Sequence, residues 1–124
     1  MNKPIIAQKA PAAVGPYVHA VKSGDLLFVS GQLGLDPVSG NLAEGIEAQA
    51  EMSLTNLGEV LKEAGFDYSD VVKTTVFITD MNNFAKVNEI YAKYFSETKP
   101  ARSCVEVSTL PKGGLVEVEC IASK

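Results

Sequence analysis

Two short segments of this chain carry apolar residues at consecutive positions, and they constrain the fold more than any other feature. Residues 26–29 (LLFV) and 76–78 (VFI) consist of apolar residue types that suit strands. Because successive side chains of a strand point to opposite faces, both faces of these strands are apolar. The fold therefore has to cover a sheet on both sides.

Two helices are available as cover. Between residues 46 and 64, apolar residues recur at steps of three and four, which predicts an amphipathic helix that ends at Gly65. A second helix is expected to begin after the capping side chains of Asp80, Asn82 and Asn83 and to end at about Phe95. The apolar stripe of this second helix consists of Phe84, Val87, Tyr91 and Phe95.

Strands account for most of the remaining chain. Alternating or β-branched runs between turn residues predict strands at residues 17–22, 26–33, 71–79, 103–109 and 115–122. Residues 4–16 contain three prolines and are expected to be extended and irregular. The resulting order, β-β-α-β-α-β-β, predicts an α+β domain with a mixed sheet and both helices on one face.

The second face of this predicted sheet has no cover within the chain. We therefore expect a homo-oligomer whose subunits pack sheet against sheet. The alternative is a partly solvated antiparallel face, which is common in sheets of this kind.

Size, composition and charge exclude several classes of protein. The 124 residues fit a single domain, residues 1–124. The composition, with 46% hydrophobic and 21% charged residues, excludes a disordered chain. The net charge of −4 argues against nucleic-acid binding, because phosphate contacts need clustered Lys and Arg, and against a basic helix on a membrane surface. No apolar run approaches the roughly 20 residues that a bilayer requires.

The N-terminal residues and the two cysteines bear on the compartment. Gln8 and Lys9 interrupt the apolar stretch near the N-terminus, so no signal peptide is expected. Cys104 and Cys120 form neither a disulfide framework nor a CxxC motif. We therefore expect a cytoplasmic protein with reduced thiols.

The last two predicted strands carry most of the candidate chemistry. Alternation directs Arg102 and Cys104 to one face of the first, and Glu117 and Glu119 to one face of the second. From their polarity, we expect both sets to share the face away from the helices. Arg102 has planar donors that grip a carboxylate, and Glu117 is suited to act as a general base or to orient a water. The alternative is an exposed cross-strand ion pair.

Other polar residues have a structural interpretation beside a functional one. Asn88 interrupts the apolar stripe of the second helix, and either bonds a backbone carbonyl or faces a ligand. Tyr17 either packs against neighbours or forms the wall of a pocket. Ser30 and Gly31 lie inside a strand, where glycine marks a bulge or a close approach to a ligand. His19 is expected to be a strand residue with satisfied hydrogen bonds.

Nucleophilic and metal chemistry find little support in the sequence. Cys104 would need a base to act as a nucleophile, and the single imidazole, His19, has no evident partner. One histidine and two separated cysteines do not supply a usual set of metal ligands. Cys104 is interpreted structurally as a small, half-buried strand residue.

Several motifs together resemble the Rid (YjgF) family, and within it the RidA group of reactive intermediate deaminases. The C-terminal motifs are residues 100–105 (PARSCV), 110–113 (LPKG) and 116–119 (VEVE). The resemblance extends to residues 15–17 (GPY), 28–32 (FVSGQ) and 84–88 (FAKVN), with Tyr91 and Phe95. It spans nearly the whole chain, and Val118 is a conservative departure where the pattern more often has Ile or Met.

The resemblance implies a chorismate-mutase-like fold that assembles as a trimer, with the sheets forming a central barrel. It implies three sites in clefts between subunits. The implied activity is hydrolysis of 2-imino acids, such as 2-iminobutanoate and 2-iminopropanoate, to 2-keto acids and ammonia. It implies no metal and no organic cofactor.

The resemblance also implies roles for particular residues. Arg102 would hold the substrate carboxylate, and Glu117 would position and activate the attacking water. Cys104 would help to place the imine nitrogen or the water through its backbone or thiol, without a covalent intermediate. Tyr17, which would reach across a subunit boundary, would line the pocket together with Ser30 and Gly31. Phe84 and Asn88 would close it from the neighbouring chain.

Two other functions compete with this interpretation. The first is a non-enzymatic small-ligand binder or chaperone-like protein, against which the presence of both Arg102 and Glu117 favours catalysis. The second is a ribonuclease or translation inhibitor, which the acidic charge and the single histidine oppose.

Overall fold

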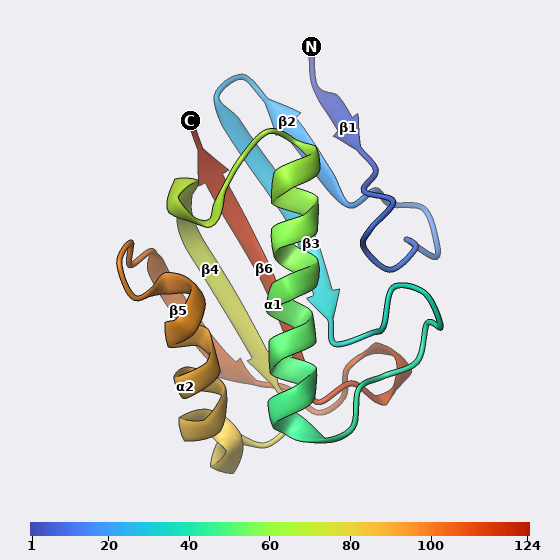
Figure 1. The fold of residues 1–124 in the computed structure, drawn as a ribbon, viewed down its shortest axis with the longest axis vertical. Helices are drawn as coiled ribbons and strands as arrows, with labels where there is room; N and C mark the ends of the chain where they lie inside the picture. Colours follow the sequence, from blue (N-terminus) through green and yellow to red (C-terminus); the bar gives the residue numbers. More distant parts are fainter.

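One six-stranded sheet and two helices form the two layers of the structure (Figure 1). The computed structural model describes residues 1–124. In chain order the strands and helices are β1 (Lys3–Ile5), β2 (Ala20–Ser23), β3 (Leu26–Leu33), α1 (Gly45–Glu63), β4 (Val71–Ile78), α2 (Phe84–Phe95), β5 (Ala101–Glu106) and β6 (Val116–Ser123). Short 3₁₀ turns occur at Tyr68–Asp70, Met81–Asn83 and Pro111–Gly113.

The strand order is β1-β2-β3-β6-β4-β5. Only the β4–β5 pair is parallel, and the other pairs are antiparallel, so the sheet is mixed as predicted. Both helices lie on the same face of the sheet, with α1 over the central strands and α2 beside it toward β5 (Figure 1). The prediction of an α+β fold with two helices on one face is confirmed.

The N-terminal part of the sheet differs from the prediction. Residues 3–5, expected to be irregular, form the edge strand β1, in which Pro4 is level with Val21. Proline fits there because the outer edge of an edge strand needs no amide donor. The next strand starts at Ala20 rather than at Tyr17, so Tyr17 and His19 precede it.

Helix α1 has a buried apolar stripe and, unexpectedly, a buried polar seam. The helix ends where predicted, and Gly65 adopts a φ of 82° just beyond it. Within the seam, Ser53 donates to the carbonyl of Gln32 at 2.6 Å, and Asn56 donates to the carbonyls of Leu33 and Leu35. The seam therefore fixes the end of β3 on the helix.

The face of the sheet away from the helices is exposed. Leu26, Phe28 and Val105 remain 39%, 44% and 42% exposed there. Phe28 is level with Ile121 of β6, so the apolar surface continues across neighbouring strands. The chain thus leaves uncovered the second apolar face that the sequence pattern indicated.

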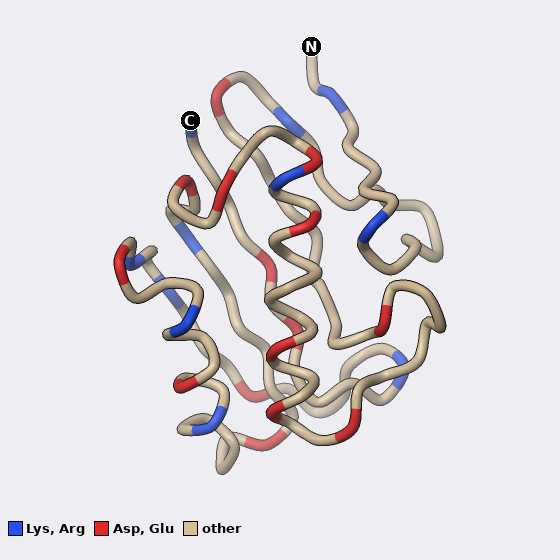
Figure 2. The backbone as a smooth tube through the Cα atoms, viewed as in Figure 1, with Lys and Arg blue, Asp and Glu red and all other residues tan.

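The charged residues form no broad basic surface. Figure 2 shows that the charges on α1 are mostly acidic, whereas basic and acidic residues alternate along α2. Neither helix has the length and the hydropathy that a membrane span requires.

Candidate active site

Arg102 is held on the helix-covered face of the sheet. It is level with Thr74 of β4, which is completely buried. Its Nη1 donates to Oδ1 of Asn88 on α2 at 2.7 Å. Its Cζ lies 4.8 Å from the ring centroid of Tyr91 and 5.5 Å from that of Phe84. Helix α2 thus orients the guanidinium by one amide and two aromatic rings, and other N–H groups of Arg102 have no partner in the chain.

A pocket of about 550 Å³ lies beside this guanidinium, between α2 and the start of β5. Its lining residues are Asn88, Tyr91, Ala92, Phe95, Ser96, Lys99, Pro100 and Arg102. The two cations in this lining favour an anionic ligand, and the planar fork of Arg102 suits a carboxylate.

Glu117 lies on the opposite face of the sheet, on β6. It is level with Leu33 of β3 and Phe77 of β4. Burial raises the pKa of its carboxyl, and the nearby Glu119 raises it further. A carboxyl whose pKa moves toward neutrality is suited to proton transfer.

Gly31 lets the Glu117 carboxyl lie against the backbone of β3. A Cβ at Gly31 would lie 2.7 Å from Cδ of Glu117, closer than carbon atoms approach. The β3–β6 register shifts between Val29 and Gln32, which agrees with a bulge, one of the two alternatives that the sequence left open for Ser30 and Gly31. Ser30 Oγ donates to the carbonyl of Val18 at 2.7 Å, so this hydroxyl fixes the segment before β2.

A second, smaller pocket of about 220 Å³ opens at Glu117. Its lining residues are Pro11, Ala12, Val14, Tyr17, His19, Gly31, Gln32, Leu33, Leu35, Pro111, Lys112 and Glu117. The structure therefore brings Tyr17 and Gly31 together with Glu117. Phe84 and Asn88 contact Arg102 of their own chain, so the expectation that they approach it from a neighbouring chain is wrong.

The expectation that Arg102, Cys104 and Glu117 share one face of a chain is wrong. Strand β4 lies between β5 and β6, so the polar sets of these two strands are not neighbours. Arg102 and Cys104 are level with Thr74 and Val76, whose partners on β6 are Cys120 and Val118. These buried partners belong to the apolar set of β6, and Glu117 belongs to the other set. Polarity alone did not reveal this register.

Cys104 is a half-buried thiol beside the core. Burial raises its pKa, and the positive charge of Arg102 opposes this only in part. Since the thiolate is the nucleophilic form, this environment does not activate Cys104 as a nucleophile.

Asn88 makes a contact that neither of its two sequence interpretations included. They were a bond to a backbone carbonyl or a ligand-facing role, whereas its Oδ1 accepts from Arg102. Tyr91 is a neighbour of the site that was not predicted from the sequence. Its hydroxyl lies 2.8 Å from Thr74 Oγ1, and its ring lies under Arg102. Tyr91 is three residues after Asn88, a helical spacing that places both on one side of α2.

Lys112 is a further residue that sequence reasoning missed. It lines the Glu117 pocket and adopts φ 59° and ψ 15°, in the left-handed region that a residue other than glycine seldom occupies. Its place within the LPKG motif is the only signal that could have indicated it.

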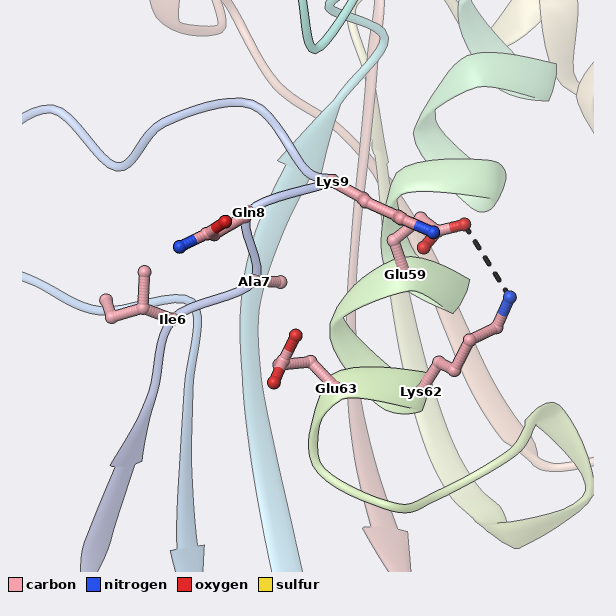
Figure 3. A pocket seen from close by; sticks show the side chains of 7 residues that line it. All are labelled: Ile6, Ala7, Gln8, Lys9, Glu59, Lys62 and Glu63. Atoms are coloured by element: carbon pink, nitrogen blue, oxygen red, sulfur yellow. Dashed lines mark ion pairs between the residues drawn. The ribbon is translucent and has the colours of Figure 1, made fainter.

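Another hollow lies between the N-terminal segment and α1 (Figure 3). Lys9, Glu59, Lys62 and Glu63 surround it, and Lys62 pairs with Glu59 at 3.8 Å. This is an open, charge-balanced surface that includes none of the predicted site residues. Nowhere in the chain do three or more His, Cys, Asp or Glu side chains gather as a possible metal site.

Comparisons with known proteins match this chain over almost its whole length. The family model for endoribonuclease L-PSP matches residues 7–124. The 2-iminobutanoate/2-iminopropanoate deaminase of Mus musculus is 51% identical over 123 residues, covering 98% of this chain and 91% of that protein. A RutC family protein of Synechocystis is 55% identical over 123 residues, covering 97% and 95%. The crystal structure of E. coli TdcF with bound serine has a TM-score of 0.95, 44% identity and 98% coverage of both chains.

Proposed function

The chain belongs to the endoribonuclease L-PSP family, the Rid (YjgF) family that its motifs resemble, and on that premise we propose that it hydrolyses 2-imino acids. The products are 2-keto acids and ammonia, with 2-iminobutanoate and 2-iminopropanoate as substrates. One observation carries the proposal. The oriented guanidinium of Arg102 and the half-buried carboxyl of Glu117 each line a pocket, and together they supply what binding and hydrolysis of a 2-imino acid require.

The two pockets complete one site only between copies of the chain. Arg102 and Glu117 lie on opposite faces of the sheet, so no ligand of this size reaches both within one chain. The exposed face around Phe28 offers the surface on which a second copy packs. We infer a homotrimer in which Arg102 of one copy and Glu117 of its neighbour face the same cleft.

Arg102 supplies the binding of the substrate carboxylate. Its free N–H groups form charge-assisted bonds to the two carboxylate oxygens, while Asn88 and the rings of Tyr91 and Phe84 keep the fork oriented. The similar TdcF structure holds serine, an amino acid that carries the same carboxylate group as the proposed substrates.

Glu117 supplies the proton transfers. Its carboxylate takes a proton from water as the water oxygen bonds to the imine carbon, and the imine nitrogen takes a proton from solvent, which gives a neutral carbinolamine. Glu117 then gives its proton to the amino group, the carbon–nitrogen bond breaks to release ammonia, and the hydroxyl proton passes to solvent as the carbonyl forms. A pKa raised by burial suits a group that both accepts and returns a proton.

The remaining site residues shape the cleft. Tyr17, Ser30 and Gly31 form the Glu117 side, and Phe84 and Asn88 form the Arg102 side. Cys104 lies two residues from Arg102 on the same face, where its backbone and its protonated thiol place the imine nitrogen or the water.

The ribonuclease function suggested by the family description finds less support. The single histidine is 3% exposed and both ring nitrogens bond backbone groups, so it is not free for acid–base catalysis of phosphodiester cleavage. The net charge of −4 also disfavours RNA.

The activity is tested by generating an imine with an amino-acid oxidase in the presence of semicarbazide. We expect the protein to divert the imine to keto acid before semicarbazide traps it. Arg102→Ala should lose this activity, whereas Lys86→Ala, an exposed change on α2, should retain it. Full activity of Arg102→Ala would disprove the role of the guanidinium.

The shared site is tested by co-expressing two inactive variants, Arg102→Ala and Glu117→Ala, with different tags. In mixed trimers about a quarter of the clefts combine an intact Arg102 with an intact Glu117, so about a quarter of the wild-type activity returns. If both residues acted within one chain, the mixed assemblies would be inactive. Each variant expressed alone with both tags is the control.

A further inference from the structure

His19 is the only histidine of the chain, and both of its ring nitrogens bond the N-terminal segment. The amide of Ala7 donates to Nδ1 at 2.8 Å, and Nε2 lies 2.7 Å from the carbonyl of Pro11. Because an amide N–H only donates, Nδ1 carries no proton; because a carbonyl only accepts, Nε2 carries one. The partners thus fix a neutral ring in one tautomer.

These two bonds are the only hydrogen bonds between residues 6–14 and the rest of the chain. The one other bond of the segment, from the amide of Ala10 to the carbonyl of Ala7, is internal. In addition, the side chains of Ala7 and Ala10 are buried, and those of Pro11 and Ala13 are half-buried. His19 therefore controls where this segment lies.

The segment forms one wall of the Glu117 pocket. Pro11, Ala12 and Val14 line that pocket together with His19 itself and Glu117. A shift of the segment changes the shape of the cleft without any change at the reacting groups. Such positioning affects substrate binding strongly, because small misplacements are costly in a preorganised site.

We propose that His19 is a positioning residue whose neutral ring holds residues 6–14 as a wall of the substrate cleft, and that protonation of the ring releases this wall. The role in catalysis rests on the proposed function. Protonation adds an N–H at Nδ1 that points at the N–H of Ala7, so two donors face each other and the bond is lost.

Three titratable side chains border His19 across the pocket: Tyr17, Lys112 and Glu117. Lys9 belongs to the same segment, but its side chain points toward Glu59 and Lys62 of α1 (Figure 3).

The first test follows the wall itself, by NMR on the assembled protein. The ¹⁵N shifts of His19 should show the Nε2–H tautomer at about pH 8, and the protection factor of the Ala7 amide should fall about tenfold by about pH 5.5. His19→Gln and His19→Asn, which keep a neutral donor and acceptor, should remove this pH dependence. Lys9→Gln, in the same segment, should behave as wild type. Unchanged protection in the wild type, or the Nδ1–H tautomer, would overturn the proposal.

The second test follows catalysis. Between about pH 8 and pH 5.5 the KM of the wild type should rise about tenfold, and this rise should be absent in His19→Gln. Glu117 is the same in both proteins, so the KM difference isolates His19. An equal rise of KM in both proteins would disprove the role in the cleft. Absence of imine hydrolysis at every pH would refute the proposed function instead, and the exchange measurement would still decide whether His19 holds the wall.

Discussion

Arg102 and Glu117 owe their chemistry to different surroundings. The guanidinium is held by one amide bond and two aromatic rings, and it keeps donors for a ligand. The carboxyl is half-buried against Gly31 and beside Glu119, so its charged form is disfavoured. The guanidinium of Arg102 is thus oriented for binding, and the carboxyl of Glu117 has a raised pKa that suits proton transfer.

Replacing Glu117 by Gln should separate activity from stability. The variant should lose about 10²- to 10⁴-fold in kcat, because general base catalysis is removed. It should also be more stable at pH 8, because a raised pKa in the folded state means that ionised Glu117 opposes folding. Thermal unfolding at matched protein concentration measures this difference.

The stability gain of Glu117→Gln should depend on pH with a defined sign. The gain should be present at a pH where Glu117 of the wild type is ionised. It should vanish as the pH falls below 4.5, the ordinary pKa of glutamate, because residue 117 is then uncharged in both proteins. Glu47→Gln, on the exposed part of α1, is the control and should show no such gain. A variant less stable than wild type at pH 8 would contradict the unfavourable burial of this carboxylate.

At the scale of elements, α1 supports the Glu117 side of the site from behind the sheet. Its Gln49 donates to the carbonyl of Ala43 and accepts from the amide of Leu115, one residue before β6. Its Asn56 bonds the carbonyls of Leu33 and Leu35, at and just beyond the end of β3. One helix thus holds both strands that meet at Gly31 and Glu117.

Replacing Asn56 by Leu should destabilise the fold by about 2–4 kcal/mol, because two backbone carbonyls lose their donor. Asn56 is 1% exposed, so no solvent replaces the lost bonds without rearrangement. Urea unfolding at fixed protein concentration measures the loss. Lys62→Ala, on the exposed side of the same helix, should change stability by less than about 0.5 kcal/mol. A stable Asn56→Leu protein would show that the seam is dispensable.

The sequence predicted what depends on local pattern. Helix α1, the end at Gly65 and the bulge at Gly31 follow from spacing and from glycine chemistry within a few residues. Arg102, the only arginine of the chain, could be chosen as a candidate from its residue type, whereas Glu117 shares its strand with Glu119.

What the sequence did not reveal depends on distant pairing. Strand β1 is short and contains Pro4, so only its partner β2 makes it a strand. The faces of Arg102 and Glu117 depend on β4 lying between β5 and β6, which alternation within each strand does not specify. The hydrogen bond between Asn88 and Arg102 follows from the position of α2 over β5.

At the scale of the whole molecule, the uncovered face of the sheet predicts assembly. Replacing Phe28 by Asp places a charge in the middle of this apolar surface, and a charge buried without a partner is costly. We expect the variant to sediment as a 13.2 kDa monomer that keeps the circular dichroism of the wild type. It should also lose imine hydrolysis, because its pockets no longer meet.

Val38 provides the matched control for this experiment. It is 96% exposed on a loop, so Val38→Asp adds the same charge away from the sheet and should leave mass and activity unchanged. A Phe28→Asp protein that keeps the wild-type mass would exclude this face as the interface. An active monomer would refute the shared cleft.

The placement of Arg102 and Glu117 on opposite sides of one sheet has a consequence for how the rate of imine hydrolysis depends on protein concentration. Under the shared-cleft proposal, a newly synthesised chain has no activity until it assembles with other copies. At dilutions where complexes fall apart, the rate should rise more steeply than linearly with the amount of protein. Translation alone then yields no working enzyme, and accumulation of partners sets the moment at which protection against imines begins.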